Sequence, residues 1–175
     1  MHALIVGANG TGKSTLIRRV LQALQKPVAG FETVKEDALA DRNGSPIYIY
    51  EAGSPRRQSP ENLVGYCRNR KATAITAGFD RFAEAYREPA DGSCVIVMDE
   101  IGFLESQSQP FCGIILSALN GSRPVLAAVR DKDTPFLRAV RSHPNARCFC
   151  ITPENREVLF REILEFMRAQ LEESK

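Results

Sequence analysis

The chain has 175 residues, of which 43% are hydrophobic and 25% are charged, a composition typical of globular proteins. It excludes disordered and collagen-like chains, and the net charge of +2 gives no support for nucleic-acid binding. Because domains usually hold roughly 100–200 residues, we expect residues 1–175 to form a single domain. The apolar run over residues 3–6 is too short for a secretory signal, and no run is long enough to span a membrane. The sequence therefore predicts a soluble cytoplasmic protein.

The cysteines do not follow the spacing of a metal site or of a disulfide framework. There are five of them, an odd number, and no C-x-x-C pair occurs. Two of them stand two residues apart on an expected strand, so their side chains would face the same side of it. Because a free cysteine behaves as a small hydrophobic side chain, we interpret all of them as reduced packing residues. They are Cys67, Cys94, Cys112, Cys148 and Cys150.

In the first half of the chain, apolar runs alternate with amphipathic segments. Residues 3–6 predict a short buried strand, which a glycine-rich turn joins to a helix over residues 13–25. Residues 28–34 and 47–50 are rich in strand formers, and the turn signal between them, residues 41–45, indicates a hairpin-like excursion. The arginine-rich stretch over residues 53–70 is expected to form exposed loops, and residues 73–86 a helix.

The second half repeats this alternation. Residues 94–98 form an unbroken apolar run, as expected for a parallel strand buried on both faces, and two more strands are expected over residues 125–129 and 147–151. Helices are expected over residues 111–119 and 134–140. The last helix should begin at Thr152, as its cap, with Pro153 in its first position, and should fray over residues 172–175. This alternation predicts an α/β fold with a mostly parallel sheet between helices, and ligands at the carboxyl ends of the strands.

A phosphate-binding motif follows the first expected strand. The run Gly7-Ala8-Asn9-Gly10-Thr11-Gly12-Lys13-Ser14 matches G-x-x-x-x-G-K-[ST], the Walker A pattern. Its glycines let backbone N–H groups turn toward phosphate oxygens, and the helix that begins at Lys13 directs its positive end at the same anion. We expect Lys13 to reach the β- and γ-phosphates, Ser14 to ligate Mg²⁺, and Thr15 to offer its backbone N–H to the α-phosphate. Gly7 through Thr15 are therefore the predicted nucleotide-binding residues, with Mg²⁺ as cofactor.

Two acidic residues and an arginine follow other buried strands. Asp99 ends the strand that begins near Val95 and is the expected Walker B carboxylate for Mg²⁺. Glu100 beside it could orient a water in line with the γ-phosphate and accept its proton, which favours hydrolysis, or it could be a solvated loop residue. Arg130 follows the strand over residues 125–129 and could stabilise γ-phosphate charge, report nucleotide state, or be an ordinary surface arginine. The candidate catalytic residues are Glu100, Lys13 and Arg130.

Other polar residues have two or more interpretations. Arg56 and Arg57 could act as arginine fingers or bind a partner, but paired exposed arginines are common on surfaces. Glu105 could support the same water network as Glu100 or have a structural role. Asn155 could contact a base or belong to a helix cap.

With both phosphate motifs placed, the chain resembles the small P-loop nucleoside-triphosphatases first described from a thermophile, also called cancer-related nucleoside-triphosphatases. The resemblance covers nearly the whole chain and includes Gly30-Phe31, Val64-Gly65-Tyr66, Asp99-Glu100-Ile101-Gly102, Pro124-Val125-Leu126-Ala127 and Thr152-Pro153-Glu154-Asn155-Arg156. It implies Mg²⁺-dependent hydrolysis of ATP, GTP and other nucleoside triphosphates. It also implies a three-layer P-loop sandwich of the additional-strand, RecA/AAA-like type, in which another strand separates the phosphate-loop strand from the Walker B strand.

Three functions therefore remain open. The first is a nucleoside-triphosphate hydrolase in which Glu100 activates water. The second is a nucleotide or small-molecule kinase with an acceptor site in the excursion over residues 30–66. The third is a slow nucleotide-dependent switch that acts on a protein or RNA. No N-K-x-D motif occurs, which disfavours a GTP-specific switch. The sequence identifies no protein partner.

Overall fold

The computed structural model describes residues 1–87 and 94–173. Strands and helices alternate through most of this part of the chain, as the sequence predicts. The strands are β1 (His2–Gly7), β2 (Val28–Lys35), β3 (Ser45–Glu51), β4 (Leu63–Arg68), β5 (Lys71–Ala74), β6 (Val95–Ile101), β7 (Val125–Arg130) and β8 (Ala146–Cys150). The α-helices are α1 (Lys13–Leu24), α2 (Thr76–Ala85), α3 (Gln109–Asn120), α4 (Pro135–Arg141) and α5 (Arg156–Glu173). Short 3₁₀ turns occur at Asp37–Leu39 and Glu105–Gln107.

Within the described residues the strands form one eight-stranded sheet in the order β5-β4-β3-β2-β6-β7-β1-β8. The strands β2, β6, β7, β1 and β8 are parallel to one another, whereas β3, β4 and β5 continue the sheet with antiparallel pairings. β7 lies between β1, which precedes the phosphate motif, and β6, which carries Asp99. This order is the additional-strand arrangement that the resemblance implies, and it confirms the expected fold class.

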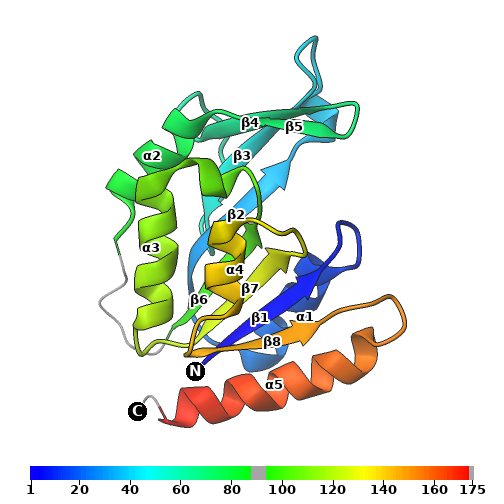
Figure 1. Ribbon diagram of the computed structural model, residues 1–175, viewed down its shortest axis with the longest axis vertical. Helices are drawn as coiled ribbons and strands as arrows, with labels where there is room; N and C mark the ends of the chain where they lie inside the picture. The colour runs from blue at the N-terminus through cyan, green and yellow to red at the C-terminus, as the bar shows by residue number, and fades with distance from the viewer. Residues whose placement is uncertain (88–93, 174–175) are drawn as a thin grey trace.

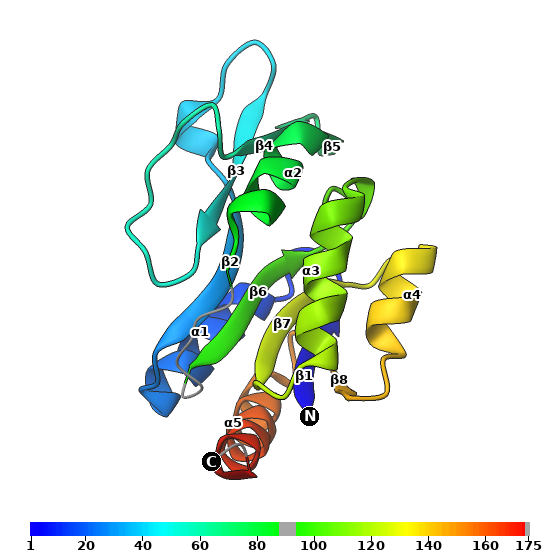
Figure 2. The same ribbon diagram turned by 90° about the vertical axis from the view of Figure 1, so that its left-hand side faces the viewer.

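Helices cover both faces of the parallel part of the sheet, so the fold has three layers (Figures 1 and 2). On one face, Leu16 and Ile17 of α1 pack with Ile163 of α5 against β1, β6 and β7. On the other face, Phe111 of α3 and Leu137 of α4 belong to a core with Phe79 of α2 and residues of β3 and β4. Both faces of the central strands are therefore buried, which explains their unbroken apolar runs.

The antiparallel strands stand above the parallel part of the sheet in both views (Figures 1 and 2). The expected hairpin forms between β2 and β3, and its turn includes the bridge between Asp41 and Gly44. The prediction of exposed loops up to residue 70 is wrong in its second half, because β4 and β5 form another hairpin there. Its turn residues Asn69 and Arg70 have φ of 50° and 62°, as a tight hairpin turn requires. The helix expected from residue 73 starts at Thr76, because Thr73 and Ala74 belong to β5.

Two predictions near the end of the chain are also wrong. α5 begins at Arg156, and Thr152 and Pro153 precede it in a turn, so Thr152 does not cap the helix. The first hydrogen bond of α5 instead runs from Leu159 N, the donor, to the carbonyl oxygen of Asn155 at 2.9 Å, so Asn155 holds the cap position.

The cysteines differ in burial. Cys148 and Cys150 are exposed rather than packed, whereas Cys94 and Cys112 are buried as expected. Of the expected frayed end, residues 172 and 173 are helical, and residues 174–175 lie outside the described part of the chain.

Among the helices of the described residues, none combines the length and apolar character needed to cross a membrane.

Candidate active site

The phosphate motif forms a loop that closes around its own lysine. Residues 7–14 connect the buried strand β1 to α1, and Gly10 and Gly12 have φ of 77° and 97°, which favour glycine. Lys13 is only 5% exposed, and its Nζ donates hydrogen bonds to the carbonyl oxygens of Gly7, at 2.9 Å, and Ala8, at 2.8 Å. Burial lowers the pKa of the Lys13 ammonium, against the opposing effect of the Glu100 charge. The loop thus holds a desolvated cation at the start of a helix, which is an arrangement suited to an anion.

Ser14 and Asp99 meet where β6 passes the start of α1. The Ser14 hydroxyl donates to Oδ1 of Asp99 at 2.8 Å, although the two residues are 85 positions apart in the sequence. Burial, together with the negative charges of Glu100 and Glu32, raises the pKa of Asp99 to about 6 against the lowering effect of the Ser14 hydrogen bond. Hydroxyl and carboxylate oxygens are the ligand types that Mg²⁺ prefers, and a cation here would offset the buried negative charge. The donor set therefore fits the predicted Mg²⁺.

Glu32 lies close to Asp99 and Glu100 and adds a third carboxylate to the site. Sequence reasoning missed this residue. It lies on β2 directly beside Asp99 in the parallel register of β2 and β6. It forms an ion pair with Arg56 from the loop that follows β3. The signal that could have found Glu32 is its place one residue after Gly30-Phe31, but only the strand register shows that this position faces Asp99.

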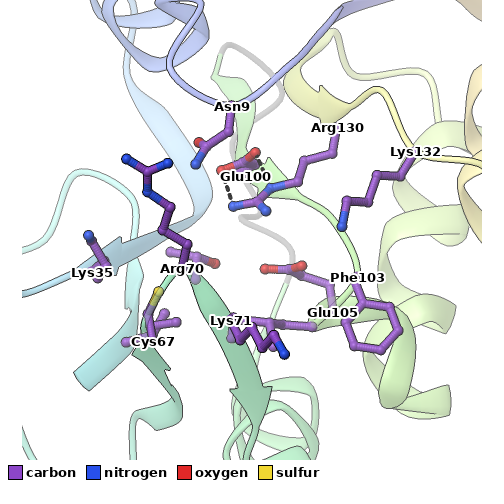
Figure 3. A pocket seen from close by; sticks show the side chains of 14 residues that line it. Asn9, Lys35, Cys67, Arg70, Lys71, Glu100, Phe103, Glu105, Arg130 and Lys132 are labelled. Carbon is purple, nitrogen blue, oxygen red and sulfur yellow. Dashed lines mark hydrogen bonds and ion pairs between the residues drawn. The ribbon is translucent and has the colours of Figure 1, made fainter. Parts of the chain in front are cut away.

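Glu100 is held by two cations. Its Oε1 lies 3.7 Å from Lys13 Nζ and accepts a hydrogen bond of 2.6 Å from Arg130 Nε, and its Oε2 lies 3.4 Å from Arg130 Nη2. Arg130 reaches Glu100 because it ends β7, which pairs with β6 on one side, and it reaches the phosphate loop because β1 on the other side places Gly7 opposite it. Glu100, Lys13 and Arg130 therefore come from three parts of the chain and meet at one edge of the sheet. Figure 3 shows Glu100 and Arg130 of this group.

Glu105 lies buried beside this group, at 4% exposure. Its Oε2 accepts a hydrogen bond of 2.9 Å from the backbone N–H of Gly102. Complete burial raises the pKa of its carboxyl to about 7, and the nearby charge of Glu100 adds to this effect. A Cβ at Gly102 would lie only 3.1 Å from Arg130 Cδ and 3.3 Å from Glu105 Oε2, so Gly102 lets these two side chains approach the same turn.

A cavity of about 810 Å³ opens on the exposed side of Glu100. Its walls come from the phosphate loop, from β2 to β5, from the turn after β6, and from the end of β7 (Figure 3). Asn9, Glu100 and Arg130 line its inner end, and Arg70 and Lys71 of the β4–β5 hairpin line another wall. This volume is within the range typical of small-molecule sites, roughly 300–1,000 Å³.

The model of one protein family, described as NTPase, matches residues 2–164 of the chain. The chain belongs to the NTPase family. This finding confirms the resemblance stated from the motifs, and the match spans the phosphate loop, Asp99-Glu100, Arg130 and the first half of α5.

Curated relatives are similar over nearly their whole length. Nucleoside-triphosphatase THEP1 of Aquifex aeolicus is 29% identical, and the alignment covers 95% of this chain and 99% of that protein. Nucleoside-triphosphatase THEP1 of Pyrococcus abyssi is 30% identical over 98% of this chain and 94% of its own. The cancer-related nucleoside-triphosphatase homolog of Bos taurus is 27% identical over 96% of this chain and 97% of its own.

Solved structures support the fold. The crystal structure of THEP1 from Aquifex aeolicus superimposes with a TM-score of 0.71 at 25% identity and covers 95% of this chain and 99% of that one. The solution structure of a human cancer-related nucleoside triphosphatase has a TM-score of 0.66 at 24% identity and covers 96% of this chain and 97% of that one. At that identity the second likeness shows the fold alone.

In this NTPase-family chain, the arginines considered as fingers lie away from the cavity wall. Arg56 pairs with Glu32, and its guanidinium lies 5.6 Å from the ring centre of Tyr50, whereas Arg57 is not among the residues that line the cavity. These contacts attach the loop that follows β3 to β2. Arg70, which the sequence predicts to lie in an exposed loop, lines the cavity instead.

The turn before α5 and the first residue of α5 lie beside the phosphate loop, away from the cavity next to Glu100. The Asn155 amide donates to the Cys150 carbonyl oxygen at 2.9 Å and its oxygen accepts from Thr152 N at 2.8 Å, so its side chain is used within its own turn. Arg156 instead donates from Nε to the Thr11 carbonyl oxygen at 2.8 Å and lines a small pocket with Gly12 and Thr15. Sequence reasoning missed this contact, because it considered Arg156 only as the last residue of the run that carries the family resemblance.

Proposed function

We propose that this chain is a Mg²⁺-dependent nucleoside-triphosphate hydrolase that converts ATP, GTP and other nucleoside triphosphates to the diphosphate and phosphate. The observation that carries the proposal is the convergence of Lys13, the Ser14–Asp99 pair and Glu100 at the carboxyl ends of β1 and β6. The names of the relatives, which are nucleoside-triphosphatases, support the same activity. Because one eight-stranded sheet runs through the described residues, we also propose that residues 1–175 act as a single domain.

In this proposal the phosphate loop binds the nucleotide. The backbone N–H groups from Gly7 to Thr15 face the phosphate oxygens, and Lys13 places its charge on the β- and γ-phosphates. Ser14 and Asp99 would hold Mg²⁺, which supplies neutralisation of the phosphate charge when it is bound. Asp99 is suited to this task because it is already oriented by the Ser14 hydroxyl.

Glu100 is the proposed catalytic carboxylate. In the structure its two oxygens are occupied by Arg130, and Lys13 lies 3.7 Å away. A γ-phosphate attracts the same two cations, so nucleotide binding would draw them from Glu100 and leave its oxygens for a water in line with the γ-phosphorus. Glu100 would then orient that water and accept its proton, while Arg130 would stabilise the charge on the γ-phosphate oxygens. The cavity on the exposed side of Glu100 leaves space for this water.

The test is Mg²⁺-dependent phosphate release from ATP, GTP, CTP and UTP by the wild type, Lys13→Ala and Glu100→Gln. Lys13→Ala should weaken nucleotide binding, because it removes the cation held by the loop. Glu100→Gln should keep nucleotide binding and lose about 100-fold or more in turnover, the usual range for a lost general base. Lys26→Ala, which removes an exposed lysine just after α1, is the matched control and should behave as the wild type. Normal turnover by Glu100→Gln would remove Glu100 from the mechanism.

A further inference from the structure

The cavity beside Glu100 has more room and more positive charge than an attacking water needs. Of the residues that line it, Lys35, Arg70, Lys71, Arg130 and Lys132 are basic. The acidic residues that line it are Glu100 and Glu105.

Both of these acids already have partners. Glu100 is paired with Arg130 at 2.6 Å, and Glu105 accepts the Gly102 N–H at 2.9 Å within the protein interior. The open part of the cavity therefore presents a surplus of cations, which favours an anion.

Arg70 and Lys71 carry most of this surplus. They are neighbours at the β4–β5 turn and both are exposed, and no hydrogen bond or ion pair of their side chains is formed with the described residues. Lys35 is less available, because its Nζ forms an ion pair with Asp37 at 2.9 Å. In Figure 3 the side chain of Arg70 extends along the cavity toward the side on which Asn9 lies.

One further feature points to an organic ligand rather than to solvent. Phe103 lines the same cavity and is 45% exposed, one of the few large apolar side chains left so open among the described residues. An uncovered aromatic ring in a cavity that is also lined by two exposed cations suits a planar ring attached to a phosphate.

We propose that this cavity binds a nucleoside monophosphate as a second ligand, separate from the nucleoside triphosphate on the phosphate loop. Its phosphate lies on Arg70 and Lys71, and its ring lies on Phe103. The inference rests on the proposed function in one respect, namely that the triphosphate occupies the phosphate loop and leaves the cavity free.

The test is equilibrium dialysis with labelled AMP in the presence of Mg²⁺ and a saturating non-hydrolysable ATP analogue, which blocks the phosphate loop. The wild type should bind one AMP per chain, and the double variant Arg70→Ala/Lys71→Ala should bind it at least tenfold more weakly. Phe103→Ala should weaken binding severalfold. Arg68→Ala is the matched control, because it removes an exposed arginine of the same hairpin that does not line the cavity, and it should bind AMP as the wild type does.

Three results would overturn the inference: loss of AMP binding when the analogue is present, unchanged binding in the double variant, or equal affinity for inorganic phosphate and AMP. Each can be told apart from failure of the proposed function. AMP binding with these variant effects in a protein that releases no phosphate from any triphosphate would contradict hydrolysis alone. Steady hydrolysis without AMP binding would contradict the second site alone.

Discussion

Glu100 shows how one side chain is prepared at the residue scale. It lies between Lys13 and Arg130, and both of these cations have a stronger electrostatic partner in a γ-phosphate than in a single carboxylate. In the protein without nucleotide, Glu100, the proposed base, is therefore paired with these two cations. This arrangement gives Arg130 two proposed roles, as the partner of Glu100 before binding and as a contact of the γ-phosphate afterwards.

Arg130→Gln tests the second role. Removing a charged donor that acts on the transition state should lower kcat by about 100-fold, with a smaller change in KM, because ground-state binding depends chiefly on the loop and Lys13. Steady-state kinetics with ATP would measure this. A kcat equal to that of the wild type would limit Arg130 to pairing with Glu100 in the free protein.

Glu105 makes a pH-dependent contribution to stability. Its pKa is raised from the ordinary 4.5 to about 7 by burial, so the folded state keeps a proton that the unfolded state releases. Its stabilising effect is therefore complete below about pH 4.5 and is lost as pH rises to about 7. Glu105→Gln keeps an acceptor for Gly102 N–H without titrating. Relative to the wild type, its free energy of unfolding should increase by roughly 1 kcal/mol or more between pH 5 and 7.5.

Urea unfolding of both proteins at several pH values measures this difference. A difference in the free energy of unfolding that stays constant across the range would show that Glu105 is already ionised in the folded protein.

At the element scale, the site depends on how closely β2 approaches β6. Gly30 on β2 has φ of 104°, and a Cβ there would lie 2.0 Å from the carbonyl oxygen of Val97 on β6. No side chain fits at this point while the two strands stay paired. The same pairing places Glu32 beside Asp99, so the close approach of the strands and the acidic group depend on one register.

Gly30→Ala should therefore destabilise the protein by about 2 kcal/mol or more, because the new methyl group meets backbone and the φ angle is strained. Gly113→Ala in α3 is the matched control. A Cβ there meets nothing within 4 Å, so this change should stabilise the helix by roughly 0.5–1 kcal/mol. Chemical denaturation of the two variants gives both values. Equal stability of Gly30→Ala and the wild type would contradict this account of the strand contact.

At the scale of the whole molecule, the buried side chain of His2 links three elements of the fold. His2 is buried at the first position of β1, where its Nε2 lies 2.8 Å from the carbonyl oxygen of Leu119 and its Nδ1 accepts from Val125 N at 3.3 Å. These contacts join β1 to the end of α3 and the start of β7. They require the neutral ring with its proton on Nε2, because a proton on Nδ1 would face the Val125 N–H.

Burial lowers the pKa of His2 below its ordinary 6.5, so the unfolded chain binds a proton that the folded chain resists. This contribution to stability is complete above pH 6.5 and declines as pH falls toward the lowered pKa. The slope from one such group is at most about 1.4 kcal/mol per pH unit. His2→Asn should show less loss of stability than the wild type between pH 6.5 and 5. Parallel stability curves for the two proteins would exclude His2 as the source of the decline.

The sequence by itself determined the alternation of strands and helices, the phosphate loop, and Asp99 and Glu100 at the end of a strand. These features are carried by contiguous residues, such as the buried run from Val95 to Met98 and the glycines around Lys13, whose conformational preferences act locally. The motif assignments for catalysis and Mg²⁺ stay predictions until the variants are measured. So does the cytoplasmic location.

Only the tertiary structure decided which distant residues share the site. β4 and β5 were missed because the short, exposed β5 has no apolar alternation, and its pairing with β4 depends on the turn at Asn69 and Arg70. The resemblance implies the strand order with β7 between β1 and β6, but only the strand register brought Glu32 beside Asp99 and Arg130 beside Glu100. Because such contacts depend on packing between segments far apart in the sequence, the local pattern around Glu32 or Arg70 does not show which residues they meet.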